Sequence, residues 1–340
     1  MQGVEPSGEF RRIARFLELA GASAGRGGIV IGPGDDAAGV RCPAGEVLVV
    51  STDASVEGVH FRREWLTWEA IGYRAAAAAM SDLAAMAARP VGALVSLALA
   101  PEHDRAVEEG LATGIGECLR SLDADLLGGD FCRSPGPVFI DVVAVGSCAA
   151  PVPRDGARPG DELWVTGVLG AAATATMAWE SGLEPDGESR RAFERPRPRT
   201  AEAGWLATRV DIHAMIDLSD GLAGDAGQVA AASGAQLRME LEALPLPHGL
   251  GSWTDRSAAL HVAAAGGEDY ELLFAASPGE IEPLRADFRA AWGAELTRIG
   301  TVEMGEGVMW VDARGRPVEP PGRGFDHFPP DPAGSANGPS

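Results

Sequence analysis

Aspartates set beside glycine or serine recur through the chain, and their carboxylates are the side chains best suited to chemistry. They occur in Gly34-Asp35-Asp36, Ser51-Thr52-Asp53, Ser81-Asp82, Gly128-Gly129-Asp130 and Asp217-Leu218-Ser219-Asp220-Gly221. Any one of these segments is also typical of a plain polar turn. Several at the ends of apolar segments predict one acidic cleft, because carboxylate oxygens are ligands that Mg²⁺ prefers. Such a cleft is typical of enzymes that handle polyphosphates.

Two of these segments carry more information than an ordinary turn. The adjacent charges of Asp35 and Asp36 repel each other unless a cation or solvent screens them. Asp217 and Asp220 precede a predicted helix, and capping that helix would need only one of the two acids. His60, by contrast, fits a surface loop as well as a site, and so does the Gly266–Asp269 segment. Spacing alone leaves the roles of the last two open.

Composition narrows the classes of protein that the chain can belong to. Its 340 residues predict about two domains, and 46% hydrophobic with 23% charged residues is typical of a soluble globular protein. The formal charge is −21, which argues against nucleic acid or an anionic membrane as a partner. All 28 basic residues are arginine, so a lysine Schiff base and the lysine of a P-loop are excluded. Any phosphate must therefore be met by arginine, metal ions or backbone N–H groups.

The cysteines and the apolar segments indicate the cytoplasm. Cys42, Cys118, Cys132 and Cys148 have no C-x-x-C spacing, so a zinc site is not expected. Charged residues precede the first apolar run, so no signal peptide is expected. The most apolar stretch, from Ala70 to Ala100, contains Arg74 and Asp82 and cannot be a transmembrane helix. We expect a cytoplasmic protein with reduced thiols.

Hydrophobic periodicity predicts mixed helices and strands in both halves of the chain. Helices are predicted over 9–20, 68–87, 104–122, 201–209 and 222–232, with an alanine-rich one after Gly170. Strands are predicted over 47–51, 91–99, 124–127, 138–147, 162–166, 215–218, 270–275 and 307–312. The strand over 47–51 should end at Thr52-Asp53, and the one over 124–127 at Gly128-Gly129-Asp130. A turn-rich stretch after residue 150 predicts domains over 1–150 and 151–328, followed by a disordered tail over 329–340.

Taken in order, eight segments resemble the thiamine-monophosphate kinase family, within the superfamily that includes aminoimidazole ribonucleotide synthetase. The matching segments are Gly34–Ala38, Ser51–Asp53, Val56–Phe61, Ser81–Met86, Gly128–Asp130, Met215–Leu222, Gly266–Phe274 and Gly324–Phe328. The resemblance implies an α/β (α+β) fold of two domains. The N-terminal domain would form a dimer-spanning β-barrel with a partner, and the C-terminal domain an α/β sandwich.

The same resemblance implies the activity and the residues of the site. The family uses ATP to phosphorylate thiamine phosphate to thiamine diphosphate with several Mg²⁺ ions, as a homodimer. Carried over by position, the metal ligands would be Asp35, Ser51, Thr52, Asp53, Asp82, Asp130, Asp217 and Asp220. ATP would be met by Gly129, Asp130, Arg154 and Ser219, and the thiamine substrate by His60, Glu268 and Phe325. Because both substrates are anions that metal ions must bring together, direct in-line transfer without a phosphoenzyme is expected.

The chain departs from the family pattern at three places, and these keep two other functions open. Ala171-Ala172 and Phe131-Cys132 stand where the family usually has Asp-Ser and two threonines, and no aromatic residue lies around Val107–Glu109, where one is expected near adenine. One alternative is another ATP-dependent enzyme of the superfamily. The other is a catalytically silent paralogue that binds metal or nucleotide.

Overall fold

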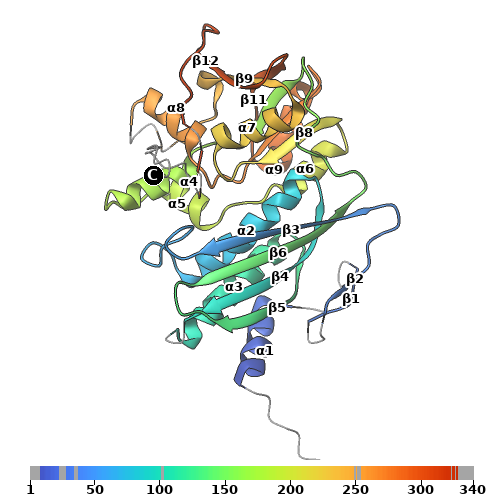
Figure 1. Cartoon of the computed structure of the whole chain (residues 1–340), viewed down its shortest axis with the longest axis vertical. Coiled ribbons are helices and arrows are strands. Elements are labelled where there is room, and N and C mark those ends of the chain that lie inside the picture. Colours follow the sequence, from blue (N-terminus) through green and yellow to red (C-terminus); the bar gives the residue numbers. More distant parts are fainter. Residues whose placement is uncertain are drawn as a thin grey trace, which may run out of the picture.

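The computed structural model describes residues 8–22, 28–33, 37–100, 103–248, 250, 254–322, 324–325 and 327. These residues form two α/β halves, stacked one above the other in Figure 1. Asp35 and Asp36, the expected tail over 329–340, Arg323, Asp326 and Phe328 lie outside the described residues. No helix in the described ranges is long and apolar enough to cross a membrane.

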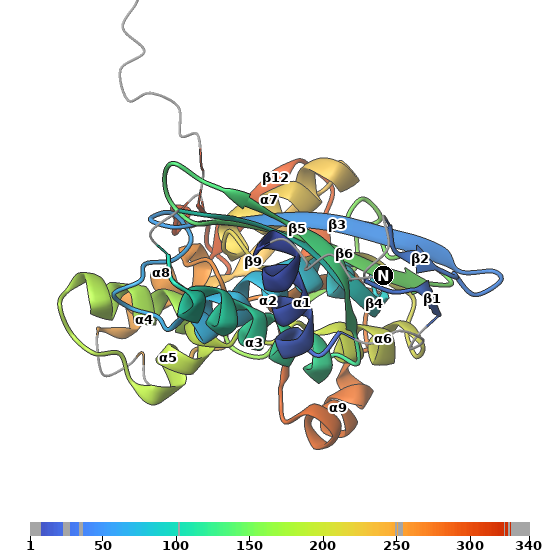
Figure 2. The same ribbon diagram turned by 90° about the horizontal axis from the view of Figure 1, so that it is seen from below.

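The N-terminal half is an open sheet with helices on one face. Its elements are α1 (Gly8–Ala20), β1 (Ile29–Ile31), β2 (Gly39–Val40), β3 (Val47–Val56), α2 (Trp68–Ala85), β4 (Arg89–Leu99), α3 (Arg105–Ser121), β5 (Asp125–Arg133) and β6 (Phe139–Cys148). The four long strands are ordered β3-β6-β4-β5, and α1, α2 and α3 lie on the same side of them (Figure 2). Within the described part of this single chain the sheet does not close into a barrel.

The C-terminal half is a mixed sheet with a core on each face. Its elements are β7 (Glu162–Thr166), α4 (Ala171–Glu180), α5 (Gly187–Glu194), α6 (Thr200–Ala207), β8 (Ile212–Asp217), α7 (Leu222–Ser233), β9 (Gln236–Glu240), α8 (Arg256–Ala265), β10 (Leu272–Ala276), α9 (Arg285–Trp292), β11 (Leu296–Glu303) and β12 (Gly307–Val311). The strands are ordered β12-β9-β11-β7-β10-β8. Alternation along β7 separates the two cores, because Leu163 and Val165 pack with α7 and α8 while Trp164 packs with α6 and α9.

Helix α2 lies between the two halves and contacts both. Thr67 caps its N-terminus, and the Thr67 hydroxyl accepts a hydrogen bond from the Ala70 N–H at 3.2 Å. Most of its residues are buried, and eight of its 18 residues are alanines, whose small side chains let β3 and β6 pack on one side and α6 and β8 on the other. The alanine-rich segment thus places Asp82 at the junction of the two halves.

Most predicted elements are confirmed within a few residues, but two strand ends are wrong. The strand that begins at Val47 continues through Thr52 and Asp53 to Val56, because all ten residues pair with β6. Likewise Gly128-Gly129-Asp130 lies inside β5, paired with β4 from Leu94 to Ser96. The local sequence suggested turns at both places. Pairing with distant strands keeps the backbone extended instead.

Candidate active site

Three of the predicted acids come together where β3, α2 and β8 meet. Asp53 lies in β3, Asp82 in the last turns of α2, and Asp217 is the final residue of β8. The Ser51 hydroxyl, on the same face of β3 as Asp53, donates a hydrogen bond to Asp82. Repulsion from Asp82 acts on both Asp53 and Asp217, which places the three carboxylates within one electrostatic neighbourhood.

These carboxylates hold protons more tightly than ordinary aspartates. Burial, together with the negative charge of Asp82, raises the pKa of Asp53 to about 7. Burial and the same neighbour raise the pKa of Asp217 to about 7. The pKa of Asp82 is also raised by burial, opposed by the Ser51 hydrogen bond and by the positive charge of Arg154. The cluster therefore lacks enough positive charge of its own to stabilise all of its carboxylates.

Asp225, in the first turn of α7, extends the cluster and was missed by sequence reasoning. It is buried, and burial with the charges of Asp217 and Asp220 raises its pKa to about 8. Its Oδ2 has no hydrogen-bond partner in the described part of the chain. Asp225 follows Gly221 by four residues, and residues four apart in a helix lie on the same face. This spacing could have indicated from the sequence that Asp225 lies near the start of α7.

The β8–α7 junction is held by backbone hydrogen bonds to segments far along the chain. The Glu268 N–H donates to the Ser219 carbonyl at 2.8 Å, and the Phe325 N–H donates to the Asp220 carbonyl at 2.9 Å. Gly221 has a φ of +104° and a Cβ there would lie 2.7 Å from the Ala265 carbonyl, so only glycine fits. These contacts bring Glu268 and Phe325 beside Ser219 and Asp220.

Thr52 and Asp130 lie on the other face of the N-terminal sheet. The Thr52 hydroxyl donates to Asp141 Oδ1 at 2.8 Å, on the face opposite Ser51 and Asp53. Asp130 is exposed and aligns through Ser96 with Asp141, so these polar side chains share the outer face. The structure thus separates them from the cluster around Asp82.

A cavity of about 360 Å³ adjoins the acid cluster and contains the three residues expected to meet thiamine. Its lining includes Asp53, His60, Trp65, Ser219, Asp220, Glu268, Tyr270, Phe325 and His327. The Nε2 atoms of His60 and His327 are 3.4 Å apart, and the rings of Phe325 and His327 meet edge to face at 4.8 Å. Trp65 and His327 were not singled out from the sequence. Burial lowers the pKa of His60, which favours the neutral imidazole.

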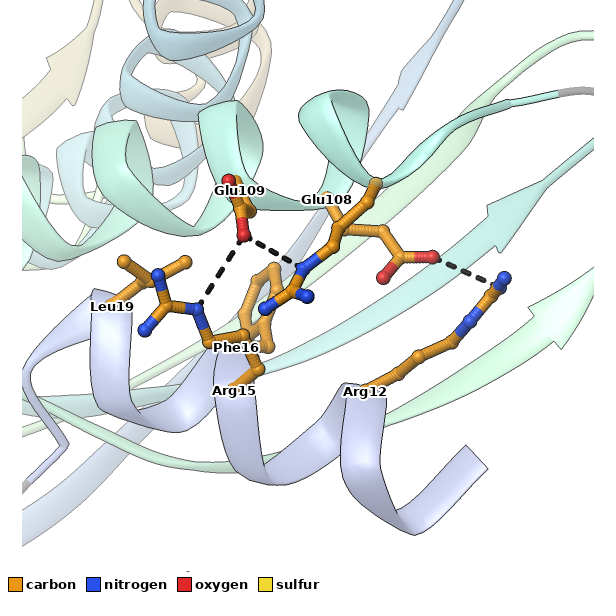
Figure 3. Close-up of a pocket in the computed structure, with 7 residues that line it drawn as sticks. Arg12, Arg15, Phe16, Leu19, Glu108 and Glu109 are labelled. Carbon is orange, nitrogen blue, oxygen red and sulfur yellow. Dashed lines mark hydrogen bonds and ion pairs between the residues drawn. The ribbon is translucent and has the colours of Figure 1, made fainter. Parts of the chain in front are cut away.

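A second cavity, of about 440 Å³, lies between α1 and α3 (Figure 3). Glu108 and Glu109 line it, from the segment where an aromatic residue was expected, and α1 contributes Phe16. Arg12 pairs with Glu108 at 2.9 Å. Phe16 also meets Phe131, the residue after Asp130, with ring centroids 5.2 Å apart. Phe16 comes from a helix some ninety residues earlier in the chain, so the 107–109 segment alone gives no sign of it.

Ala171-Ala172, one of the departures from the family pattern, forms the start of α4. Asp269 Oδ2 accepts a hydrogen bond from the Gly170 N–H at 2.8 Å, and the N–H groups of both alanines also act on this carboxylate. Asp269 thereby satisfies the free donors at this helix end. The alanines thus leave the local structure of the α4 terminus intact.

Comparison with known proteins places this geometry in a family. The model for AIR synthase related protein, N-terminal domain, matches residues 34–148, and the model for the corresponding C-terminal domain matches 158–311. The thiamine-monophosphate kinase of Caulobacter vibrioides is 34% identical over 330 residues, covering 95% of this chain and 91% of that protein. The chain belongs to the thiamine-monophosphate kinase family.

Solved structures agree with this assignment and confirm the expected fold of two α/β domains. The thiamine-monophosphate kinase of Stenotrophomonas maltophilia matches with a TM-score of 0.77 and 35% identity, covering 88% of this chain and 94% of that chain. AaThiL complexed with AMPPCP and TMP matches with a TM-score of 0.74 and 29% identity, covering 96% of this chain and 99% of that chain. The resemblance that the eight sequence segments indicate is therefore confirmed.

Proposed function

We propose that this member of the thiamine-monophosphate kinase family transfers the terminal phosphoryl group of ATP to thiamine phosphate. One observation carries the proposal: the cavity that contains His60, Glu268 and Phe325 is also lined by Asp53 and Asp220 of the acid cluster. An organic cation can thus lie beside a site for polyphosphate. The ligands named for AaThiL, AMPPCP and TMP, support the same pair of substrates.

The donor set fits Mg²⁺ in its chemistry. Asp53, Asp82 and Asp217 offer hard oxygen atoms and repel one another when no cation is present. Among the described residues, no three His, Cys, Asp or Glu side chains lie close enough together to hold a metal ion. We assign Ser51 and Asp220 to the same set, with Asp35 completing it. Bound Mg²⁺ would neutralise phosphate charge and align the reacting oxygens.

Thr52 and Asp130 would belong to a second group of ligands on the outer face, with Asp141 beside them. Their separation from Asp82 by the thickness of the sheet favours more than one ion. Gly129 has no side chain, and its Cβ position would lie 1.9 Å from the Val95 carbonyl, so this segment requires glycine. Because residue 129 has no side chain, nothing on that residue shields its backbone N–H group from the phosphates of ATP.

The side chains of the cavity bind and orient the acceptor. Its attacking phosphate oxygen is already ionised, so no general base is needed. Neutral His60 adds no positive charge beside the cationic thiazolium, Glu268 attracts it, and Phe325 offers an aromatic surface. Arg154, whose charge already acts on Asp82 and Asp217, would offset the charge of the ATP phosphates, together with Ser219.

The cavity between α1 and α3 is the proposed position of the adenine. Phe131, in the edge strand β5, contacts Phe16 of this cavity, so a nucleotide bound at Asp130 on the outer face would pass around this edge of the sheet to reach it. Leu19→Trp, which fills the cavity, should raise the KM for ATP roughly tenfold and leave the KM for thiamine phosphate within about twofold. Ala14→Trp, on the exposed side of α1, is the control for the bulk of tryptophan. Equal KM values for ATP in both variants would place the adenine elsewhere.

The outer face of the N-terminal sheet is proposed to close a barrel with a second copy of the chain. Leu48 and Val50 project from it, 49% and 56% exposed, and β3 is an edge strand. Val50→Arg should therefore convert a dimer of about twice 35.1 kDa into monomers, as measured by light scattering after size exclusion. Leu183→Arg changes an equally exposed leucine in the other half and should leave the mass unchanged. A monomeric wild type would contradict the shared barrel.

The proposal also includes the domain boundary and the location of the protein in the cell. The domain boundary is placed in the turn-rich stretch after residue 150, since the two family models end at 148 and begin at 158. A cytoplasmic location is supported by the four free thiols, Cys42, Cys118, Cys132 and Cys148.

Formation of thiamine diphosphate from thiamine phosphate and Mg·ATP is the decisive assay. Product is expected with the wild type, and no phosphorylated form of the enzyme should be trapped during turnover. ATP binding without any product would favour the silent paralogue. Turnover of an aminoimidazole-type substrate would favour the other enzymes of the superfamily.

A further inference from the structure

Arg74 is a buried cation in the middle of α2, and its side chain is only 5% exposed. Its guanidinium donates to three acceptors: the Phe193 carbonyl at 2.5 Å, the His60 carbonyl at 3.2 Å and Glu268 Oε2 at 2.6 Å. It also lies over the Phe193 ring, 3.8 Å from the centroid. A buried charge is tolerated only where it is paired in this way. Arg74 thus joins three segments that surround the thiamine cavity.

Tyr270 also holds this carboxylate. Its hydroxyl donates to Glu268 Oε2 at 2.9 Å, and the residue is buried. Both residues adopt the left-handed backbone region, with φ of +74° at Glu268 and +51° at Tyr270. Such angles are rare for side chains of this size and cluster at functional sites. The strained turn is what puts these two side chains within hydrogen-bond distance.

Both donors use the same oxygen of Glu268. Oε2 accepts from Arg74 and Tyr270, whereas no donor among the described residues is hydrogen-bonded to Oε1. The side chain is 26% exposed and lines the cavity beside His60 and Phe325. Two hydrogen bonds from buried donors therefore hold the Oε2 end of the carboxylate in place.

We propose that Arg74 and Tyr270 are positioning residues that aim Glu268 Oε1 at the acceptor substrate. The inference rests on the proposed function and names the chemistry of recognition: a cationic heteroaromatic ring, or an amino group that it carries. Substrate meets Glu268 and not Arg74, because Arg74 is covered by Phe193 and the His60 loop. Both positioning residues act through one carboxylate, so their effects depend on it.

Tyr270→Phe is the cleanest test, because it removes one hydroxyl and keeps the buried ring. The KM for thiamine phosphate should rise roughly tenfold, while kcat and the KM for ATP stay within about twofold. Arg74→Gln should raise the same KM roughly a hundredfold. Arg74→Lys should recover part of that loss, since it keeps the charge but not the planar fork of donors.

Arg195→Gln is the matched control. Arg195 also links the two halves, pairing with Glu117 and lying over the Tyr73 ring at 4.7 Å, but it does not touch Glu268. This variant should leave the KM for thiamine phosphate unchanged. If the KM for thiamine phosphate rose equally in Arg195→Gln and in Tyr270→Phe, the cause would be weaker contact between the two halves. The orientation of Glu268 would then not determine this KM.

A double-mutant cycle separates positioning from a structural role. In the Glu268→Gln background, Tyr270→Phe should change the KM for thiamine phosphate by less than about twofold, because its partner has already lost its charge. The same tenfold rise in both backgrounds would overturn the inference. So would a parallel loss of kcat and of ATP affinity.

The proposed reaction and this inference can fail separately. If the wild type makes product and Tyr270→Phe behaves like it, the inference fails and the function stands. If the wild type makes no product but binds thiamine phosphate in calorimetry, the reaction fails, and the same variants are compared through Kd. A wild type that binds no thiamine phosphate overturns both.

Discussion

Asp53→Asn should abolish phosphoryl transfer and leave the chain folded. Asp53 lies in the middle of β3, where burial and the charge of Asp82 raise its pKa to about 7. Asparagine keeps the shape and removes a charge that its neighbours repel, so the metal-free protein should be at least as stable as the wild type. Loss of one Mg²⁺ ligand should lower kcat by at least roughly a thousandfold.

The measurement is product formation at saturating ATP and thiamine phosphate, paired with a thermal unfolding curve. Asp123→Asn makes the same chemical change at an exposed turn with a φ of +54°, a conformation that asparagine accepts. It should keep wild-type activity. An active Asp53→Asn would remove Asp53 from the ligand set, and an unfolded one would show that its charge supports β3.

The metal-free protein should be more stable at pH 5 than at pH 8. The folded-state pKa values of Asp53 and Asp217 are raised to about 7, above the ordinary value of 3.8. Folding therefore favours their protonated forms, and the stability that this gives is lost as pH rises through about 7. For buried Asp217 the loss begins above 3.8 and is complete near 7, so the interval from pH 5 to pH 8 contains about two pH units of it, or roughly 3 kcal/mol. A fall of several degrees in Tm is expected.

Added Mg²⁺ should reverse that trend, because it binds only the ionised carboxylates. Thermal unfolding in EDTA and in excess Mg²⁺, at both pH values, checks the prediction. The stabilisation by Mg²⁺ should be several degrees larger at pH 8 than at pH 5. Identical Tm values in EDTA at the two pH values would mean that the carboxylates are not crowded without metal.

The longer elements could be predicted from the sequence because their patterns are local. The alanine run before Arg89-Pro90 indicates α2, and the alternation after it indicates β4. By contrast, α5 buries only Ser189 and Phe193, so its hydrophobic face is too narrow to recognise. The strand β9 has five residues and depends on pairing with β11 and β12 across the sheet, which no local window contains.

For the site, too, local sequence motifs could be recognised, whereas contacts between distant segments could not. Motifs marked Asp53, Asp82 and Asp217, and the fold brings them together. Which face each residue occupies depends on the pairing of β3 with β6, and that pairing separates Thr52 from Asp53. The contact between Arg74 and Glu268 spans 194 residues of sequence, so a lone arginine in an apolar helix was the only signal available.

The burial of α2 restricts how the two halves can move. Because alanines pack against a strand or helix on nearly every side, the helix cannot tilt without opening voids on one side and clashes on the other. Hinge closure between the halves is thus disfavoured as a route for substrate exchange. Entry and exit should instead depend on exposed residues at the rim of the cavity, such as Gly58 and Phe325, and not on rotation of the two halves about α2.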